Sequence, residues 1–389
     1  MVQENSQIHS IIHKCYHSNI IKEGEYILKS GDLSKYYFDF KNLVAHPALL
    51  KEIGDYLYNQ IKLSKVKFTH IAAIAIGGIP IACYISTKYD IPMVMVRGEK
   101  KEYGTGKQIE GDYKKGVKTI LIDDVMTSGG SLMDTMSQLG GKMDVVGIYV
   151  IMDRQVVTPK LEIDNKLYTV NSVLNKTDIV RYRLSQIMIK KKSKICLSLD
   201  LQNQDHFFGV LDKIGNKIVT VKIHSDITVG DFSEFREKLI KYSIEQEFLI
   251  MEDRKFVDIS YISSKQYGQY KNWVDMVTVM GNINSEVIWG MSGVVIVNDM
   301  SNNDFDWTPR VHTLLENIDL CKHVIGIVSQ SRFPNINMYT MTPGINKQVK
   351  NINDQKYRTM DTVDADLYII GRGLYNGDPL VNISGFLKQ

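Results

Sequence analysis

The feature that most constrains the fold is a series of eight short, β-rich apolar segments in the second half of the chain. Helix-like stretches such as 233–246 and 310–318 separate most of them. Near-continuous apolar strands that alternate with helices favour a parallel sheet covered on both faces. Eight such units predict a closed (β/α)8 TIM barrel over residues 194–389. The segments are 194–199, 217–223, 247–251, 275–280, 293–298, 323–329, 336–341 and 366–371.

The first half of the chain predicts a different α/β architecture. An apolar run over 69–82 leads through a Gly-rich turn into a helix, and 117–132 and 145–153 begin in the same way. These runs predict an open, doubly wound, mostly parallel sheet with binding sites at the strand ends. The basic stretch MIKKKSK, residues 188–194, predicts a solvated linker, and a phosphate-binding patch is the alternative. The predicted domains are therefore 1–190 and 194–389, which suits a chain of 389 residues.

Composition argues against several classes of protein. A formal net charge of +3, from 47 basic and 44 acidic residues, gives no global argument for nucleic-acid binding. No apolar run approaches the ~20 residues of a membrane span, and the polar N-terminal residues do not form a signal peptide. We therefore expect a soluble cytoplasmic protein with no nucleic-acid or membrane partner. Four scattered cysteines predict buried thiols in a reducing compartment, namely Cys15, Cys83, Cys196 and Cys321.

The most informative stretch of the first half is ILIDDVMTSGGS, an apolar strand that ends in an acidic pair before a small-residue turn and a helix. Outward-facing amides at a helix N-terminus favour an anion, so the turn predicts a phosphate site. The acidic pair can accept hydrogen bonds from sugar hydroxyls or hold hydrated Mg²⁺, which together suits a phosphorylated ribose. An ordinary strand-turn-helix with a solvated acidic corner is the alternative. The candidate residues are Asp123, Asp124, Val125, Met126, Thr127, Ser128, Gly129, Gly130 and Ser131.

This stretch resembles the 5-phosphoribosyl-1-pyrophosphate (PRPP) motif of type I phosphoribosyltransferases. LKSGDLSKYYFDFKNL, VRGEKKEYGTGKQIEG and MDRQ, beginning at residues 28, 96 and 152, resemble three further motifs of the orotate phosphoribosyltransferases. The resemblance covers roughly residues 20–190. It implies that orotate and PRPP are the substrates. It also implies that Mg²⁺ is bound mainly through PRPP and not by protein ligands alone.

The same resemblance implies roles for individual residues. Lys29 and Arg154 would bind orotate, and Thr127 would lie between the phosphate loop and the base. Arg97 and Lys101 would grip pyrophosphate from a mobile loop that closes over the reacting complex. Lys101 would act in catalysis together with the acidic pair Asp123 and Asp124.

Charged residues cluster at the predicted strand ends of the second half. Lys222 ends the second strand, and Asp253, Lys255 and Asp258 follow the third. The active sites of such barrels lie at the carboxyl ends of the strands, so these charges predict a site. An ion-pair network that closes the barrel is the alternative. Other strand ends carry Asp200, His224, Ser301 and Arg372.

The segment EDRKFVDI, with SLDL and KIHSDI upstream, resembles the orotidine 5′-monophosphate decarboxylases over about 194–389. The resemblance implies that Lys255 protonates the ring carbon and that Asp253 sits beside the departing carboxylate. Lys222 and Asp258 would complete the network, with Asp258 serving the partner's site in a homodimer with shared active sites. No cofactor is implied for this step. The implied nucleotide-binding residues are Asp200, Lys222, Ser301, Pro343, Gln355, Tyr357, Gly371 and Arg372.

Some positions depart from the two family patterns. Gly98 stands where a second loop lysine is usual, and Tyr103 stands where a histidine is usual. Ile262 replaces a threonine that helps to hold ribose, and Ser263 could compensate only after a register change. The two loop departures affect the details of pyrophosphate binding. Ile262 and the altered segment after the fourth strand predict altered ribose contacts and a weaker decarboxylase.

The two resemblances in one chain imply a bifunctional UMP synthase, which converts orotate and PRPP to orotidine 5′-monophosphate and then to UMP. Two alternatives remain at this point. In one, the transferase is active and the barrel only binds nucleotide. In the other, the chain is a regulatory nucleotide-binding protein on a spent enzyme scaffold.

Overall fold

The computed structural model describes the chain in ten ranges. The described ranges are 2–28, 31–98, 107–155, 160–163, 165–228, 230–301, 306–333, 338–348, 351–352 and 355–387. The chain divides into two compact units, and the second takes a short segment from the N-terminal part of the sequence. The first unit comprises Met1–Lys22 and Tyr37–Ile179, and the second comprises Glu23–Tyr36 and Val180–Gln389.

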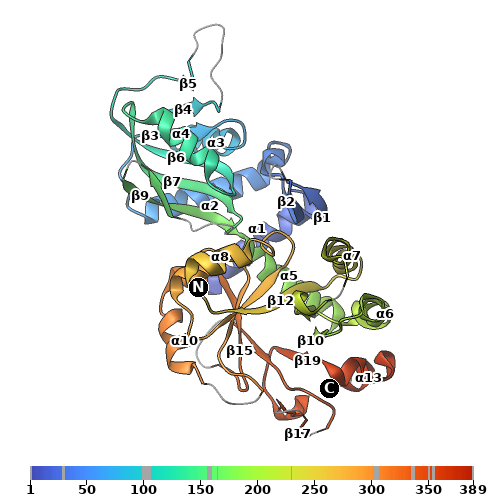
Figure 1. The fold of residues 1–389 in the computed structure, drawn as a ribbon. Coiled ribbons are helices and arrows are strands. Elements are labelled where there is room, and N and C mark those ends of the chain that lie inside the picture. Colours follow the sequence, from blue (N-terminus) through green and yellow to red (C-terminus); the bar gives the residue numbers. More distant parts are fainter. Residues whose placement is uncertain are drawn as a thin grey trace. The chain divides into compact units, whose positions relative to one another are not determined.

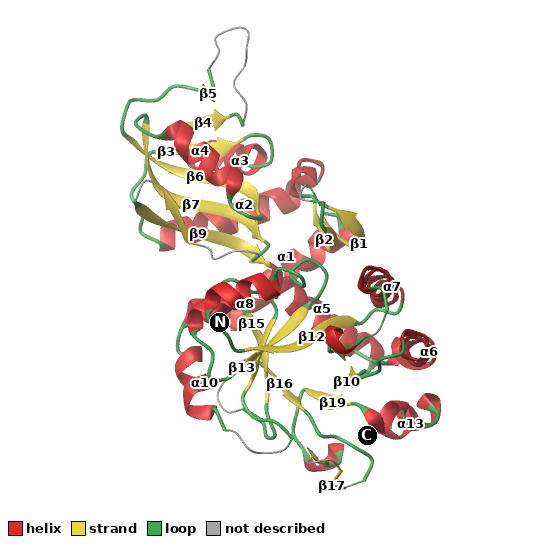
Figure 2. Ribbon diagram, in the orientation of Figure 1, coloured by secondary structure: helices red, strands yellow, loops and turns green. Residues whose placement is uncertain are grey.

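A seven-stranded open sheet forms the centre of the first unit, in the order β5-β4-β3-β6-β7-β9-β8 (Figures 1 and 2). The five inner strands are parallel, and the edge strands β5 and β8 are antiparallel to their neighbours. This is the predicted open, mostly parallel sheet. The strands are β3 (His70–Ile74), β4 (Met93–Val96), β5 (Ile109–Glu110), β6 (Val117–Met126), β7 (Met143–Asp153), β8 (Lys160–Ile163) and β9 (Lys166–Asn175).

Side chains alternate between the two faces of this sheet along each strand, and both faces are buried. On one face, Leu121 of β6 packs with Leu132 and Met136 of helix α4. Its neighbours Ile120 and Ile122 point to the other face and are equally buried. The helical elements of this unit are α1 (Val2–His17), η1 (Phe40–Ala45), α2 (Pro47–Leu63), α3 (Ile79–Tyr89), α4 (Gly130–Leu139) and the start of α5 (Lys176–Lys191).

Eight parallel strands close the predicted barrel in the second unit, and each predicted segment overlaps one of them. Figure 2 shows helices arranged around the outside of these strands. The strands are β10 (Ile195–Ser198), β11 (Thr220–Ile223), β12 (Leu249–Phe256), β13 (Met276–Met280), β14 (Val294–Val297), β15 (Val324–Val328), β16 (Tyr339–Thr342) and β19 (Leu367–Ile370).

The helices of the barrel follow its strands, and the longer ones bury an apolar face against them. In the described residues between β15 and β16 there is no helix, as the short link predicts. The helices are α6 (Gln204–Ile214), η2 (Gly215–Lys217), η3 (Ser225–Ile227), α7 (Phe232–Glu245), α8 (Ser260–Tyr267), α9 (Ser285–Trp289), α10 (Thr308–Leu315), α11 (Ile318–Cys321), η4 (Met360–Thr362), α12 (Arg372–Tyr375) and α13 (Pro379–Leu387).

The basic stretch at 188–194 is not a separate linker, because helix α5 continues through Lys191, but Lys190, Lys192 and Lys194 are exposed to solvent as predicted. Leu184 of this helix is fully buried in the cluster formed by inward-facing barrel residues. Burial lowers the pKa of Lys191 to about 7, and its long apolar stem allows the ammonium to reach backbone acceptors. Its Nζ donates to the carbonyls of Gly215, Ile218 and Gln246 at 3.1, 2.7 and 2.6 Å.

Two small antiparallel pairs complete the fold, β1 (Ile21–Ile27) with β2 (Leu33–Phe38) and β17 (Asn351–Ile352) with β18 (Gln355–Lys356). None of the helices within the described ranges is long and apolar enough to cross a membrane. The prediction of buried thiols holds for Cys15 and Cys196 but is wrong for Cys83, which is exposed on α3.

Candidate active sites

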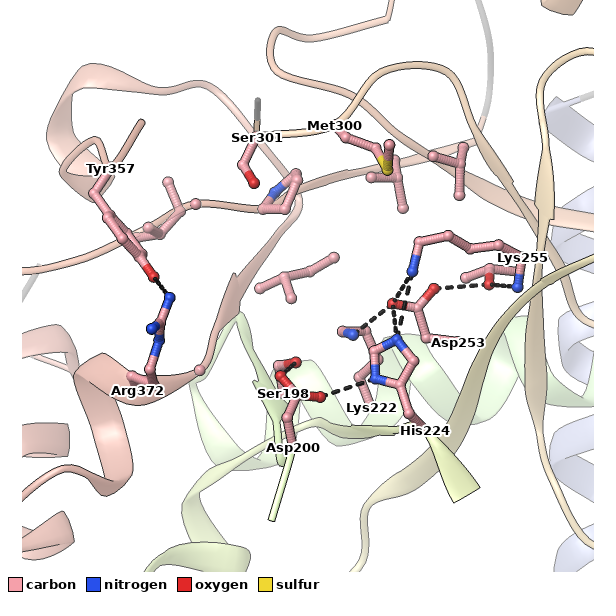
Figure 3. A pocket seen from close by; sticks show the side chains of 18 of the residues that line it. Ser198, Asp200, Lys222, His224, Asp253, Lys255, Met300, Ser301, Tyr357 and Arg372 are labelled. Atoms are coloured by element: carbon pink, nitrogen blue, oxygen red, sulfur yellow. Dashed lines mark hydrogen bonds and ion pairs between the residues drawn. The ribbon is translucent and has the colours of Figure 1, made fainter. Parts of the chain in front are cut away.

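A cavity of about 440 Å³ opens at the carboxyl ends of the barrel strands, where the sequence predicts a site. Figure 3 shows a cluster of Lys222, His224, Asp253 and Lys255 on one side and the pair Tyr357 and Arg372 on the other. Further lining residues include Ser198, Asp200, Thr278, Met300, Ser301, Pro343, Gly344, Ile345, Gly371 and Tyr375. The cavity therefore places separate cationic groups at its two ends.

Asp253 is the centre of the charged cluster. Its Oδ2 lies 2.5 Å from Lys222 Nζ, 2.9 Å from Lys255 Nζ and 3.3 Å from His224 Nε2. Its Oδ1 accepts a 2.8 Å hydrogen bond from Thr278 Oγ1. This buried carboxylate contacts two ammonium groups and a hydroxyl, which compensate its negative charge.

A local irregularity in β12 presents Lys255 to the cavity. The sequence predicts that Asp253 and Lys255 follow the strand. The strand instead extends through Phe256 and contains both residues. The pairing of β12 with β13 changes register between Glu252 and Phe256, and Lys255 has a φ of 52°. A non-glycine residue in this region is strained and is held by its surroundings. The Lys255 amide donates a 2.9 Å hydrogen bond to Thr278 Oγ1, which fixes the bulge against the next strand.

The electrostatics favour the charged forms of Asp253 and Lys222. Burial raises the pKa of Asp253, but Lys222, His224 and Lys255 outweigh it and hold that pKa well below its usual range. Burial lowers the pKa of Lys222, but Asp253 and Asp200 together raise it above its ordinary value. Fixed positive charge therefore lies beside the carboxylate, and it would stabilise negative charge that develops in the cavity.

His224 and Asp200 form a second pair at the cavity wall. His224 Nδ1 lies 2.9 Å from Asp200 Oδ1, and the bonds to Asp200 and Asp253 raise the pKa of the imidazole. Ser198 Oγ donates to the other Asp200 oxygen at 3.1 Å. His224 thus lines the cavity while both of its nitrogens face carboxylates.

The opposite end of the cavity suits an anion. Arg372 at the start of α12 donates a 2.9 Å hydrogen bond to the hydroxyl of Tyr357. Gly344 has a φ of 73°, and a Cβ there would lie 3.0 Å from Ser301 Cβ, so glycine lets these two loops approach. Pro343 and Gly371 line the same cavity as predicted. Gln355 belongs to β18, but its side chain lies outside the described residues.

Three residues after β12 do not join the cluster within this chain. Asp258 is exposed, and its carboxylate accepts the amide of Ile259 at 2.8 Å. Ile262 is 36% exposed on α8, and the fully buried Ser263 donates to the Asp258 carbonyl at 2.9 Å. Ser263 is therefore engaged with the turn that precedes α8 and does not replace the missing threonine. The role of Asp258 in a partner's site stays a prediction.

In the first unit, the acidic strand end lies against the Gly-rich turn after β3. A Cβ at Gly77 would lie 2.1 Å from Asp124 Cγ, so only glycine permits this approach. Burial and the charge of Asp124 raise the pKa of Asp123 to about 8, against a smaller opposite effect from Lys41. The two carboxylates are crowded, so a hydroxyl donor or hydrated cation between them would stabilise their ionised form.

The predicted phosphate turn follows β6 directly. Gly129 has a φ of 80° and precedes α4, which begins at Gly130 with no side chain capping its amides. Val125 and Met126 end the strand, and Thr127, Ser128 and Ser131 complete the predicted set around the turn. A helix terminus of this kind suits an anion, and its role as a phosphate site stays a prediction.

The structure describes some of the other predicted transferase residues and not others. Arg154 is buried after β7, its amide bonds to the Met126 carbonyl at 3.1 Å, and its guanidinium lies 5.8 Å from the Phe38 ring centre. Arg97 at the end of β4 lies 3.5 Å from Glu110. Lys29 and Lys101, and with Lys101 most of the predicted mobile loop, lie outside the described residues.

Comparisons with known proteins agree with this division. The Phosphoribosyl transferase domain matches residues 39–186, and the Orotidine 5'-phosphate decarboxylase / HUMPS family matches residues 193–383. An orotate phosphoribosyltransferase from Pyrococcus furiosus is 38% identical over 136 residues, 35% of this chain and 75% of that protein. The chain belongs to the orotate phosphoribosyltransferase family.

Relatives named as uridine 5'-monophosphate synthases match nearly the whole chain. A uridine 5'-monophosphate synthase from Caenorhabditis elegans is 26% identical and covers 94% of this chain and 91% of its own length. A second, from Bos taurus, is 25% identical and covers 96% and 94%. With the decarboxylase family matched over the barrel, the chain has the organisation of a bifunctional UMP synthase.

Sequence reasoning missed Thr278, which joins Asp253 to the Lys255 backbone. Its position could be read from strand alternation, because Met276, Thr278 and Met280 share one face of β13. The contact of Phe38 with Arg154 was also missed, because no local pattern links residues so far apart in the sequence.

Proposed function

We propose that this chain catalyses the last two steps of UMP synthesis. In the first, orotate and PRPP give orotidine 5′-monophosphate and pyrophosphate. In the second, the barrel releases CO₂ to give UMP. The observation that carries the proposal is Asp253 held between Lys222 and Lys255, across one cavity from the Tyr357–Arg372 pair.

For decarboxylation, the phosphate of the nucleotide would bind Arg372 and Tyr357, with Ser301 near the pyrimidine and Asp200 and Lys222 near the ribose. The carboxylate would then lie beside Asp253. As the bond to CO₂ breaks, its electron pair stays on the ring carbon and takes a proton from Lys255 Nζ. Contacts remote from this bond supply binding energy that is used at the reacting centre. Thr278 and Lys222 hold Asp253 in place throughout.

For ribosyl transfer, the Gly129–Gly130 turn would bind the 5′-phosphate and Asp123 and Asp124 would bind ribose hydroxyls. Arg154 would orient orotate, and Arg97 and Lys101 would hold pyrophosphate. The bond from ribose to pyrophosphate breaks as a bond to the orotate ring nitrogen forms. Mg²⁺ bound with PRPP would neutralise the leaving group, and the crowded carboxylates Asp123 and Asp124 fit such a hydrated cation. The protein would act as a homodimer in the cytoplasm.

Assays that follow the two reactions separately test this proposal. The purified chain should convert orotate and PRPP to UMP in the presence of Mg²⁺, and chromatography of the reaction mixture would detect the product. Lys255→Ala should stop at orotidine 5′-monophosphate. Asp124→Asn should form no product from orotate but should still decarboxylate added orotidine 5′-monophosphate.

The same experiment distinguishes the alternatives. A chain that accumulates orotidine 5′-monophosphate and binds UMP would be a transferase with a binding-only barrel. A chain that forms neither product, although folded and able to bind UMP, would be a nucleotide-binding protein without either activity.

A further inference from the structure

A strand from the N-terminal part of the chain is built into the barrel unit. The hairpin β1–β2 supplies Glu23–Tyr36 to that unit, and β2 ends at Phe38 in the first unit. The Lys35 amide donates to the Asn272 carbonyl at 3.1 Å, and Asn272 Nδ2 donates to Asp32 at 3.2 Å. Arg183 of α5 pairs with Glu23 at 2.5 Å. The hairpin is therefore joined to barrel residues by backbone and side-chain contacts.

The strongest of these contacts is a buried ion pair. Lys35 Nζ lies 2.7 Å from Asp275 Oδ2 and 2.8 Å from Ser243 Oγ, and both charged side chains are essentially inaccessible to solvent. Tyr36 donates its hydroxyl to Asp275 Oδ1 at 2.6 Å. Asp275 also accepts the amide of Ile250 at 2.7 Å. A fully buried lysine requires such compensation, so this pair determines where β2 can lie.

The other end of the same strand meets the orotate side of the transferase. Phe38, three residues after Lys35, places its ring 5.8 Å from the guanidinium of Arg154. Lys41, three residues further, lowers the pKa of Asp123. The matched phosphoribosyl transferase domain begins only at residue 39, so the ion pair lies outside it.

We propose that Lys35, through its buried ion pair with Asp275, is a positioning residue that holds β2 and Phe38 for orotate binding. The transferase reaction then depends on a residue of the barrel. This inference rests on the proposed function. It predicts a specific kinetic pattern, because a displaced Phe38 would weaken the binding of orotate and not that of PRPP, whose predicted residues lie on other elements.

The test uses full-length variants. Lys35→Met should raise the KM for orotate about tenfold, Tyr36→Phe about threefold, and Lys35→Arg should restore much of the loss. The KM for PRPP and the kcat/KM of decarboxylation should change less than about twofold. Lys191→Met is the matched control, because it removes another lysine of the barrel unit that does not contact the hairpin.

The outcomes separate clearly. Decarboxylase activity shows that a variant is folded, and if Lys35→Met fails this check the milder Tyr36→Phe decides. An unchanged KM for orotate in a folded variant overturns the inference. So does an equal rise in the KM values for orotate and PRPP, which would indicate a general structural role.

Amide hydrogen exchange separates failure of this inference from failure of the proposed function. In the unaltered chain, the β2 amides should exchange as slowly as those of β13, and Lys35→Met should speed β2 exchange at least about tenfold. Slow β2 exchange without any transferase activity contradicts the proposed function alone. Fast β2 exchange in the unaltered chain contradicts the inference.

Discussion

The barrel site and the transferase site handle charge in opposite ways. In the barrel, Asp253 is ionised beside Lys222 and Lys255, so the counter-charges belong to the protein. In the transferase, Asp123 and Asp124 crowd one another, and the pKa of Asp123 rises to about 8. The barrel supplies its own counter-charges, whereas the acidic pair requires hydroxyls or a cation from outside.

This difference follows from what each reaction must stabilise. Decarboxylation develops charge at one carbon, so a fixed ammonium can be placed there in advance. Ribosyl transfer releases a highly charged pyrophosphate, and we propose that PRPP brings the metal that neutralises it. A protein cation fixed at the acidic pair would compete with the sugar hydroxyls that are proposed to bind there.

The largest effect that we expect comes from removal of a built-in cation. Lys255→Ala should lower kcat for decarboxylation by at least about 1,000-fold, roughly 4 kcal/mol, because it removes the proposed proton donor to the ring carbon. Loss of ultraviolet absorbance by orotidine 5′-monophosphate measures it. Lys265→Ala on the exposed side of α8 is the control. A loss below about tenfold would show that the cluster is not the catalytic centre.

For the acidic pair of the transferase site, we expect stability to depend on pH. The Asp123 pKa is about 8 in the folded chain and about 4 when unfolded, so the folded state binds this proton more tightly. The free energy of unfolding should therefore fall as pH rises from about 4 to 8. Asp123→Asn should remove this fall, by about 1.4 kcal/mol for each pKa unit of the shift.

Thermal unfolding between pH 5 and pH 8 measures this difference between the unaltered chain and the variant. Asp134→Asn, an exposed residue of α4, is the matched control. Parallel pH profiles for the unaltered chain and Asp123→Asn would show that the acidic pair is not strained, and would remove the contrast with the barrel.

A smaller effect tests how the barrel site is held. Thr278→Val keeps the volume but removes the hydroxyl that binds Asp253 and accepts the Lys255 amide. We expect kcat to fall about tenfold while nucleotide binding stays near normal, since one buried hydrogen-bonding group is worth about 1–3 kcal/mol. UMP titration and kinetics of the same sample measure both. A change confined to KM would place Thr278 in substrate binding instead.

The smallest effect concerns the phosphate end of the cavity. Tyr357→Phe removes one hydrogen bond to Arg372. The KM for orotidine 5′-monophosphate should rise about threefold, under 1 kcal/mol, with kcat unchanged. Arg332→Lys, in an exposed ion pair with Asp364, serves as the control. A fall in kcat without a change in KM would contradict the assignment of this end to phosphate binding.

Local patterns predicted most of the strands and the chemical character of both sites. Continuous apolar runs located the barrel strands, and charged residues near their carboxyl ends marked the barrel site. The predicted boundary of β12 failed, because a charged run reads as a loop although pairing with β13 keeps it in the sheet. The basic stretch at the end of α5 failed for a related reason, since Lys191 finds carbonyl partners that are distant in sequence.

The amino-acid sequence by itself determined the two fold classes, the order of the activities and the strand ends at which the candidate site residues lie, because these depend on short-range periodicity and motif spacing. The tertiary structure decided that Asp253 meets Thr278, that α5 packs into the barrel's interior cluster and that Lys35 pairs with Asp275. Lys35 and Asp275 are 240 residues apart, and no local pattern encodes their pairing. Only closure of the barrel and burial of both charges bring them together, since each ion requires the other once water is excluded.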